Sequence, residues 1–138
     1  MATVRRSVAT LRISGETLQP QKITAALGCE PTSAQTKGET LVGAKTGIAR
    51  IAKFGMWRLE ATEREPADLD SQVSDILSKL SPDLNTWKEI TSAYDADLFC
   101  GFFMDQPNEG LEISPASLAA LGNRGLILSL DIYSEETP

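Results

Sequence analysis

The sequence predicts an α+β domain with a ferredoxin-like β-α-β-β-α-β core, preceded by an extra strand and helix. Two observations predict this fold. Segments with alternating apolar residues, typical of strands with one buried face, are interspersed with segments whose apolar residues recur at helical intervals. A turn-rich stretch at residues 105–110 lies between two predicted strands and indicates a hairpin. We expect a mixed, mostly antiparallel sheet with its helices on one face, because crossover connections are right-handed.

The extra N-terminal unit is a strand followed by a short helix. Apolar and polar residues alternate over Val8–Ser14, and Gly15 ends the predicted strand. Pro20 suits the first position of a helix, and Gly28 suits its end because glycine tolerates a positive φ. This unit precedes the core in the chain, so we expect it to be an addition to the core.

The first half of the predicted core contains a long excursion, a strand and an amphipathic helix. Residues 30–53 show no sustained period, which predicts a long excursion with room for a short strand at its end. Phe54–Ala61 alternates and predicts the first core strand. Apolar residues from Leu69 to Leu80 recur at helical spacing. The Ser81-Pro82 pair then breaks or restarts the helix, with serine as the cap.

The second half of the core is predicted to hold three strands and one short helix. Ala96–Met104 is an aromatic-rich strand, and Leu111–Ser114 should return beside it as its hairpin partner. Ser114 and Pro115 then suit the cap and first turn of a helix. Alternation resumes from Leu126 to Ile132 in the last strand. We expect one domain over residues 1–138, with a frayed tail at 134–138.

The charge and residue content exclude several classes of function. The 138 residues hold 13 Lys and Arg against 19 Asp and Glu, a net charge of −6, which argues against nucleic-acid binding. No apolar run approaches the length of a membrane helix. The chain has no histidine and two scattered cysteines, Cys29 and Cys100, so we expect no metal, no cofactor and reduced thiols in the cytoplasm. The Arg5-Arg6 pair has a faint likeness to an export signal, but Arg12 interrupts the apolar segment that should follow.

Several short motifs follow one another along the chain in a characteristic order. They are LRISG, ITAALGCEPT, TKGE, GMWRLEA, DADLFCGFF, GLEISPASLAALGNRG and LDIY. By the order and spacing of these motifs, the sequence from about Thr10 to Tyr133 resembles the bacterial domain-of-unknown-function family 4279, although the stretch between Gly38 and Phe54 looks longer than the family pattern. The resemblance implies a compact bacterial αβ domain, and it supplies no catalytic residues.

The strand positions that point away from the helices form the candidate binding face. Charges of both signs alternate there with aromatic residues, and two interpretations remain open. The face is either solvated, with weak cross-strand ion pairs, or it is the surface that a protein partner or a second copy covers. We expect its two arginines to be exposed and replaceable at little cost in stability. The candidate residues are Arg12, Arg58, Glu60, Asp97, Phe99, Glu112, Asp131 and Tyr133.

We assign no catalytic residue. Asp97 and Asp131 are the only carboxylate pair that suggests acid–base chemistry, and carboxylates on strands are more often ion-paired. Ser114 and Ser117 have no adjacent base, so a capping role is favoured over a nucleophilic one. Trp57 and Trp87 each fall at an apolar position, where core packing is the default and ligand stacking the alternative.

We therefore expect a non-enzymatic protein-binding module, one version being an immunity-type protein that neutralises a basic toxin. The alternative is a small-molecule-binding sensor, or an enzyme, with a site between residues 30–53 and the sheet. A flat face of mixed charge favours the module. A deep pocket lined by Trp57 and converging charges favours the alternative.

Overall fold

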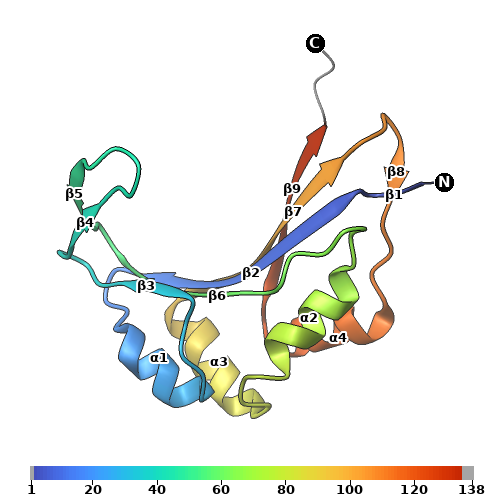
Figure 1. Cartoon of the computed structure of the whole chain (residues 1–138). Coiled ribbons are helices and arrows are strands. Elements are labelled where there is room, and N and C mark those ends of the chain that lie inside the picture. Colours follow the sequence, from blue (N-terminus) through green and yellow to red (C-terminus); the bar gives the residue numbers. More distant parts are fainter. Residues whose placement is uncertain (1, 135–138) are drawn as a thin grey trace.

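The computed structural model describes residues 2–134, whose main feature is a five-stranded sheet backed by helices (Figure 1). The strand order is β3-β6-β2-β7-β9. All neighbours are antiparallel except β7 and β9, which run parallel. Ser134 closes β9, and the rest of the predicted frayed tail lies outside the described residues. The five strands are β2 (Arg6–Gly15), β3 (Ser33–Gln35), β6 (Gly55–Glu60), β7 (Asp95–Met104) and β9 (Ile127–Ser134).

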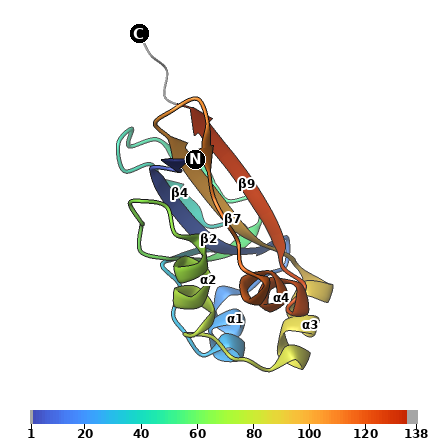
Figure 2. The same cartoon turned by 90° about the vertical axis from the view of Figure 1, so that its right-hand side faces the viewer.

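Four helices lie together on one face of this sheet, as expected (Figures 1 and 2). They bury the apolar side of each strand, so that Leu11, Ile13, Trp57 and Leu98 are at most 1% exposed. The fold is therefore α+β with a mixed, mostly antiparallel sheet. The helices are α1 (Pro20–Leu27), α2 (Leu69–Leu77), α3 (Leu84–Ala93) and α4 (Pro115–Asn123).

The ferredoxin-like arrangement is not confirmed. The strand predicted at Leu111–Ser114 does not form. Instead, β8 (Glu109–Gly110) pairs in parallel with β1 (Ala2–Thr3) in a separate two-stranded sheet. The N-terminal strand β2 is not an addition at the margin, because it lies in the middle of the main sheet between β6 and β7. Alternation identifies a strand and its buried face, but it does not name the neighbours of that strand.

The connection between the second and third helices also differs from the prediction. Ser81 does not cap α3, because the side chain of Asp83 does so by accepting a hydrogen bond from the backbone N–H of Asn85 at 2.9 Å. Ser81 instead accepts from the Asp83 backbone N–H at 3.2 Å. Aspartate satisfies the free N–H groups of a first turn as well as serine does, so the capping signal was displaced by two residues.

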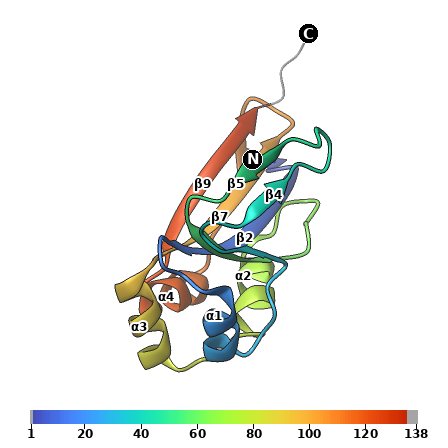
Figure 3. The same cartoon turned by 90° about the vertical axis from the view of Figure 1, so that its left-hand side faces the viewer.

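The excursion at residues 30–53 is more regular than its sequence suggests. β3 joins the edge of the sheet beside β6, and β4 (Thr40–Val42) pairs with β5 (Ala49–Ile51) to form a hairpin. The hairpin projects on the side of the sheet opposite the helices (Figures 1 and 3). The β4–β5 hairpin therefore stands at one end of an otherwise open sheet face.

Candidate functional site: the helix-free face of the sheet

The helix-free face consists of the outward-pointing residues of the five strands, and it carries seven of the eight candidate residues. Strand alternation places Arg12 opposite the buried Leu11 and Ile13, and Arg58 opposite the buried Trp57. The register brings these positions side by side across the sheet, with Arg12 between Arg58 and Asp97. The seven residues are Arg12, Arg58, Glu60, Asp97, Phe99, Asp131 and Tyr133.

Glu112 is the exception, and its placement on this face was wrong. It follows β8 in the connection to α4, which does not belong to the main sheet. Glu112 lines a separate hollow near β1, beside Ala2, Leu69 and Leu111. The error follows from the strand predicted at Leu111–Ser114. Because that strand does not form, its alternation cannot place Glu112 on the sheet face.

The middle of the face is a fixed polar group that we call the central cluster: Arg12, Asp97, Phe99 and Ser129. Arg12 donates two hydrogen bonds to Asp97, at 2.9 and 2.6 Å, and its guanidinium lies 4.3 Å from the centre of the Phe99 ring. Ser129 donates to the same carboxylate at 2.8 Å. The hydrogen bond to Asp97 raises the pKa of Arg12, although partial burial opposes that shift. The central cluster is internally satisfied.

Arg58 is exposed, as expected of both arginines, whereas Arg12 is partly buried in an ion pair with Asp97. The side chain of Arg12 is 34% exposed and that of Asp97 only 17%. A glutamate in place of Arg12 would set two carboxylates side by side and remove a bidentate contact. Arg58 is exposed, and in the described chain no carboxylate lies within ion-pair distance of it.

A second group, the outer cluster, consists of Arg6, Phe103, Asp131 and Tyr133. The rings of Phe103 and Tyr133 stack with their centres 4.9 Å apart, and the Arg6 guanidinium lies 3.8 Å from the Phe103 ring centre. The Tyr133 hydroxyl donates to Asp131, and this hydrogen bond raises the pKa of Tyr133. Arg6 was missed as a site residue because the predicted strand began at Val8. Extending the same alternation by two residues places Arg6 on this face.

The hairpin end of the face is hollowed. A hollow of about 250 Å³ lies between the β4–β5 hairpin and the sheet, and a second of about 310 Å³ adjoins it at Met56. Arg50 of the hairpin and Arg58 of β6 both line the first, and neither has an ion-pair partner among residues 2–134. The first hollow is lined by Ser33, Ala34, Gln35, Leu41, Arg50, Met56 and Arg58.

The two tryptophans belong to the core, as the default interpretation predicted. Trp57 and Trp87 are both fully buried. The indole N–H of Trp57 donates to the Thr24 hydroxyl at 3.0 Å, and that of Trp87 donates to the Ser81 carbonyl at 2.8 Å. Trp57 therefore points away from the helix-free face, and it does not line the hollows at the hairpin.

The two candidate carboxylates are hydrogen-bonded within the face, and the thiol of Cys100 is buried. Asp97 is held by the central cluster and Asp131 by Tyr133, so the two carboxylates do not converge on a common point. Burial, with a smaller contribution from Asp97, raises the pKa of the Cys100 thiol to about 12, which keeps it protonated near neutral pH. Within the described residues, no group of three or more Cys, Asp or Glu could hold a metal ion.

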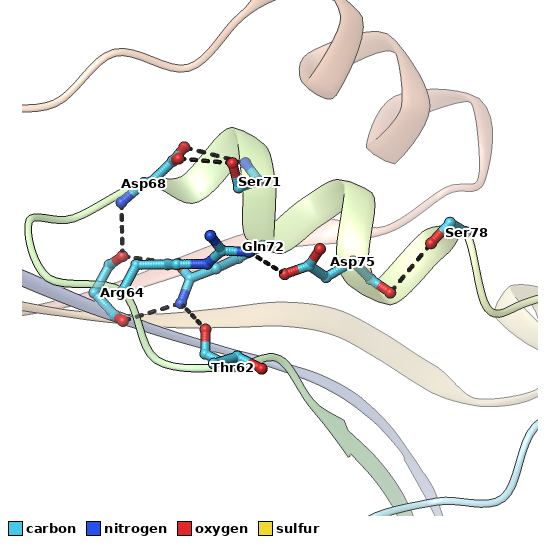
Figure 4. A network of polar contacts seen from close by, with 8 residues as sticks. Thr62, Arg64, Asp68, Ser71, Gln72, Asp75 and Ser78 are labelled. Carbon is cyan, nitrogen blue, oxygen red and sulfur yellow. Dashed lines mark hydrogen bonds and ion pairs between the residues drawn. The ribbon is translucent and has the colours of Figure 1, made fainter.

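A buried polar network on the helix side is structural (Figure 4). The Ser7 hydroxyl donates to the side-chain oxygen of Gln72 at 2.7 Å. The Gln72 amide donates to the carbonyls of Ser7 at 2.9 Å and Thr62 at 3.1 Å. Nearby, Arg64 pairs with Asp75 at 2.6 Å. Both Ser7 and Gln72 are fully buried, so the network anchors α2 to the central strand and has no access to a ligand.

The serines of the SPAS motif act as the start of a helix, which confirms the capping prediction. Ser114 accepts from the backbone N–H of Ser117 at 3.2 Å. Asp70, in the first turn of α2, accepts from the Ser117 hydroxyl at 2.6 Å and from the Ser114 backbone N–H at 3.0 Å. One carboxylate thus joins the first turns of α2 and α4.

This carboxylate makes the stability dependent on pH. The hydrogen bond from the Ser117 hydroxyl, followed by that from Ser114, lowers the pKa of Asp70 below its ordinary value of 3.8. A carboxylate whose pKa is lowered by folding stabilises the folded state at pH values above its ordinary pKa. This stabilisation is lost as the pH falls through the pKa of the folded state. Asp70→Asn should cost about 1 kcal/mol near neutral pH, because it weakens charge-assisted hydrogen bonds at a partly exposed site. Urea unfolding should show this difference shrinking in acid, and a difference that is constant with pH would contradict the assignment.

The fold and the face define an α+β protein whose sheet is covered by helices on one side and bare on the other. The chain belongs to the family described as Domain of unknown function (DUF4279), whose model matches residues 3–135. Neither a curated protein nor a solved structure matches the chain significantly. In the described part of the chain, no helix is long and apolar enough to cross a membrane.

Proposed function

We propose that this protein is a non-enzymatic binding module that captures a protein partner on the helix-free face. One observation carries the proposal: the face is a broad, uncovered part of the sheet whose side chains are already held in defined positions. Arg12 is fixed by Asp97, and Arg6, Phe103 and Tyr133 form a stack. Arginine and tyrosine held in this way contribute strongly at protein interfaces, because little conformational freedom remains to be lost on binding.

The chemistry of the hairpin end favours a partner with an acidic group at its contact surface. Arg50 of the hairpin and Arg58 of β6 line the same hollow, and neither is engaged by a carboxylate of the described chain. Arginine binds carboxylates in a bidentate manner, so an acidic side chain between them would complete the pair. The immunity-type version remains a prediction supported by the net charge of −6 alone.

Reversing these two charges should abolish partner capture and leave the fold intact. Both arginines are exposed, so Arg50→Glu with Arg58→Glu should change the stability by about 1 kcal/mol or less. The immobilised protein would be exposed to an extract of the cells that make it, and the retained proteins would be quantified by mass spectrometry. The amount of a specific partner retained by the double variant should be lower than that retained by wild type by about tenfold or more, as expected when arginine anchors are lost.

The matched control is Lys22→Glu with Lys88→Glu, which makes the same change in net charge on the exposed surfaces of α1 and α3. It should retain the partner at the wild-type level. Equal retention of every specific protein by the double arginine variant and wild type would refute the face as the binding surface. A loss shared by both double variants would mean that overall charge, not the face, controls capture.

A second candidate function rests on the hollow itself. A small anionic molecule, such as a carboxylate or phosphate compound, would fit a space of about 250 Å³ that has two arginines, Ser33 and Gln35 in its lining. A set of small anions would be tested for a rise in melting temperature. Binding at this site requires that the rise disappear in Arg58→Gln and persist in Lys88→Gln.

The location that best suits this module is the cytoplasm. Cys29 and Cys100 are both free thiols, and one of them, Cys29, is only partly buried. Free thiols persist in reducing compartments and tend to oxidise elsewhere. This supports the cytoplasmic assignment.

A further inference from the structure

Strand β9 forms one edge of the five-stranded sheet and has β7 as its neighbour on one side only. Figures 2 and 3 both show β9 along the outer margin of the sheet, with the described chain on its inner side. An edge strand presents unpaired backbone N–H and C=O groups, which can pair with a strand of another molecule.

This edge has few of the features by which proteins usually protect such strands, with Asp131 as its one charged residue. β9 is eight residues long and contains neither proline nor lysine. Its apolar side chains are unusually exposed: Ile127 is 66%, Ile132 59% and Leu130 49% exposed. The opposite edge, β3, is only three residues long and is followed by the β4–β5 hairpin. The β3 edge is therefore too short to pair extensively with another strand, whereas the β9 edge is long and apolar.

We propose that β9 pairs antiparallel with β9 of a second copy, joining two sheets into one of ten strands. This inference goes beyond the proposed function, because it uses the sheet edge rather than the arginines at the hairpin end. The occupant is a second copy of this chain because the β9 sequence is complementary to itself.

The self-complementarity fixes one register. A two-fold axis perpendicular to the sheet and passing by Leu130 places each Leu130 opposite its counterpart. Leu128 then lies opposite Ile132 of the second copy, and Ile127 opposite Tyr133 of the second copy. Directly opposite residues of antiparallel strands point to the same face, so apolar residues meet apolar or aromatic ones on both faces. Asp131, the one charged residue of β9, lies opposite the small neutral Ser129.

The neighbouring registers are worse. An axis at Asp131 would bring two carboxylates directly opposite one another, which is destabilising. An axis at Ser129 would place Ile127 opposite Asp131 and leave Tyr133 beyond the end of the other strand. Like the pairing at Leu130, both of these registers keep the helices of the two copies on one side of the joint sheet. They therefore differ from it only in which side chains lie opposite one another.

Sedimentation of the intact protein over a range of concentrations tests the proposal. Wild type should reach twice the chain mass of 14.9 kDa. Leu130→Lys should raise the dimer dissociation constant by about tenfold or more, because it sets two lysines opposite each other at the centre. Leu130→Glu should do the same through two carboxylates. An equimolar mixture of the two variants should regain dimers at close to wild-type affinity, since lysine then faces glutamate. No other register brings residue 130 opposite itself.

A matched pair of substitutions guards against an effect on folding. Ile132→Lys should weaken the dimer, whereas Ile51→Lys, which alters an isoleucine of the same 59% exposure on the hairpin, should not. Melting curves identify any variant that fails to fold. If a variant at position 130 fails to fold, the comparison of Ile132→Lys with Ile51→Lys decides whether β9 forms the dimer contact. A wild-type protein that stays monomeric at its highest soluble concentration would overturn the proposal. So would a dimer that Leu130→Lys and Ile132→Lys leave unchanged, or one that the mixed variants fail to restore.

Discussion

Replacing Gln72 by methionine is expected to lower the free energy of unfolding by about 3 kcal/mol, close to 10 °C in melting temperature for a chain of this size. Methionine fills a similar volume but makes no hydrogen bonds of comparable strength. The substitution therefore leaves the Ser7 hydroxyl and the carbonyls of Ser7 and Thr62 without the partners that Gln72 supplies at 2.7, 2.9 and 3.1 Å. Ser7 and Gln72 are fully buried, so water cannot readily replace the partners lost at Ser7, whereas Thr62 is an exposed residue.

Thermal and urea unfolding would measure the loss, with Gln21→Met on the exposed surface of α1 as the control, which should change stability little. Ser7→Ala combined with Gln72→Met should cost less than the sum of the two single changes, because removing both partners leaves fewer unsatisfied groups. If Gln72→Met unfolds like the Gln21→Met control, the buried network does not anchor α2.

Adding one methyl group at Gly55 should destabilise the fold by about 3 kcal/mol or more. A Cβ at this position would lie 2.3 Å from the carbonyl oxygen of Leu18 and 3.1 Å from its carbonyl carbon. Those are backbone atoms of the turn between β2 and α1, and they cannot swing aside as a flexible side chain could. Gly55→Ala therefore forces apart the start of β6 and the approach to α1, which together hold the hairpin end of the helix-free face.

The control is the same substitution in α4. At Gly122 a Cβ would meet nothing within 4 Å, and its φ is not in the left-handed region. Gly122→Ala should raise stability by about 0.5–1 kcal/mol, because alanine loses less conformational freedom than glycine in a helix. Equal effects of Gly55→Ala and Gly122→Ala on the urea midpoint would contradict the close approach at Gly55.

The four longest strands, β2, β6, β7 and β9, and their buried faces were predictable because alternation is a local property. Leu11 and Ile13 indicate the buried face of their strand whichever strands pair with it, and Arg12 between them must point to the opposite face. The order of strands was not predictable in the same way. β2 pairs with both β6 and β7, which lie forty or more residues away in the chain, and no local pattern encodes that choice. The strand predicted at Leu111–Ser114, which does not form, shows the same limit. Turn residues predict that the chain changes direction, but they do not predict which strand the following residues pair with.

The candidate site was predictable to the extent that it lies on strands. Seven of its residues follow from alternation, whereas Glu112 was misplaced and Arg50 was missed. Arg50 lies in residues 30–53, where three-residue strands are too short to show a period. Its position above the sheet depends on how the hairpin packs beside Ser33 and Arg58, which is a tertiary property.

Site-specific photo-cross-linking tests most directly whether the helix-free face is the binding surface. Ser33 lies opposite Arg58 in the sheet and lines the hollow beneath the hairpin, whereas Ser92 is another exposed serine, on α3. A photoreactive phenylalanine analogue would replace each serine in turn, in the cells that make the protein. We predict that position 33 becomes covalently linked to a partner protein and that position 92 does not. A partner linked at position 92 with none at position 33 would contradict the account.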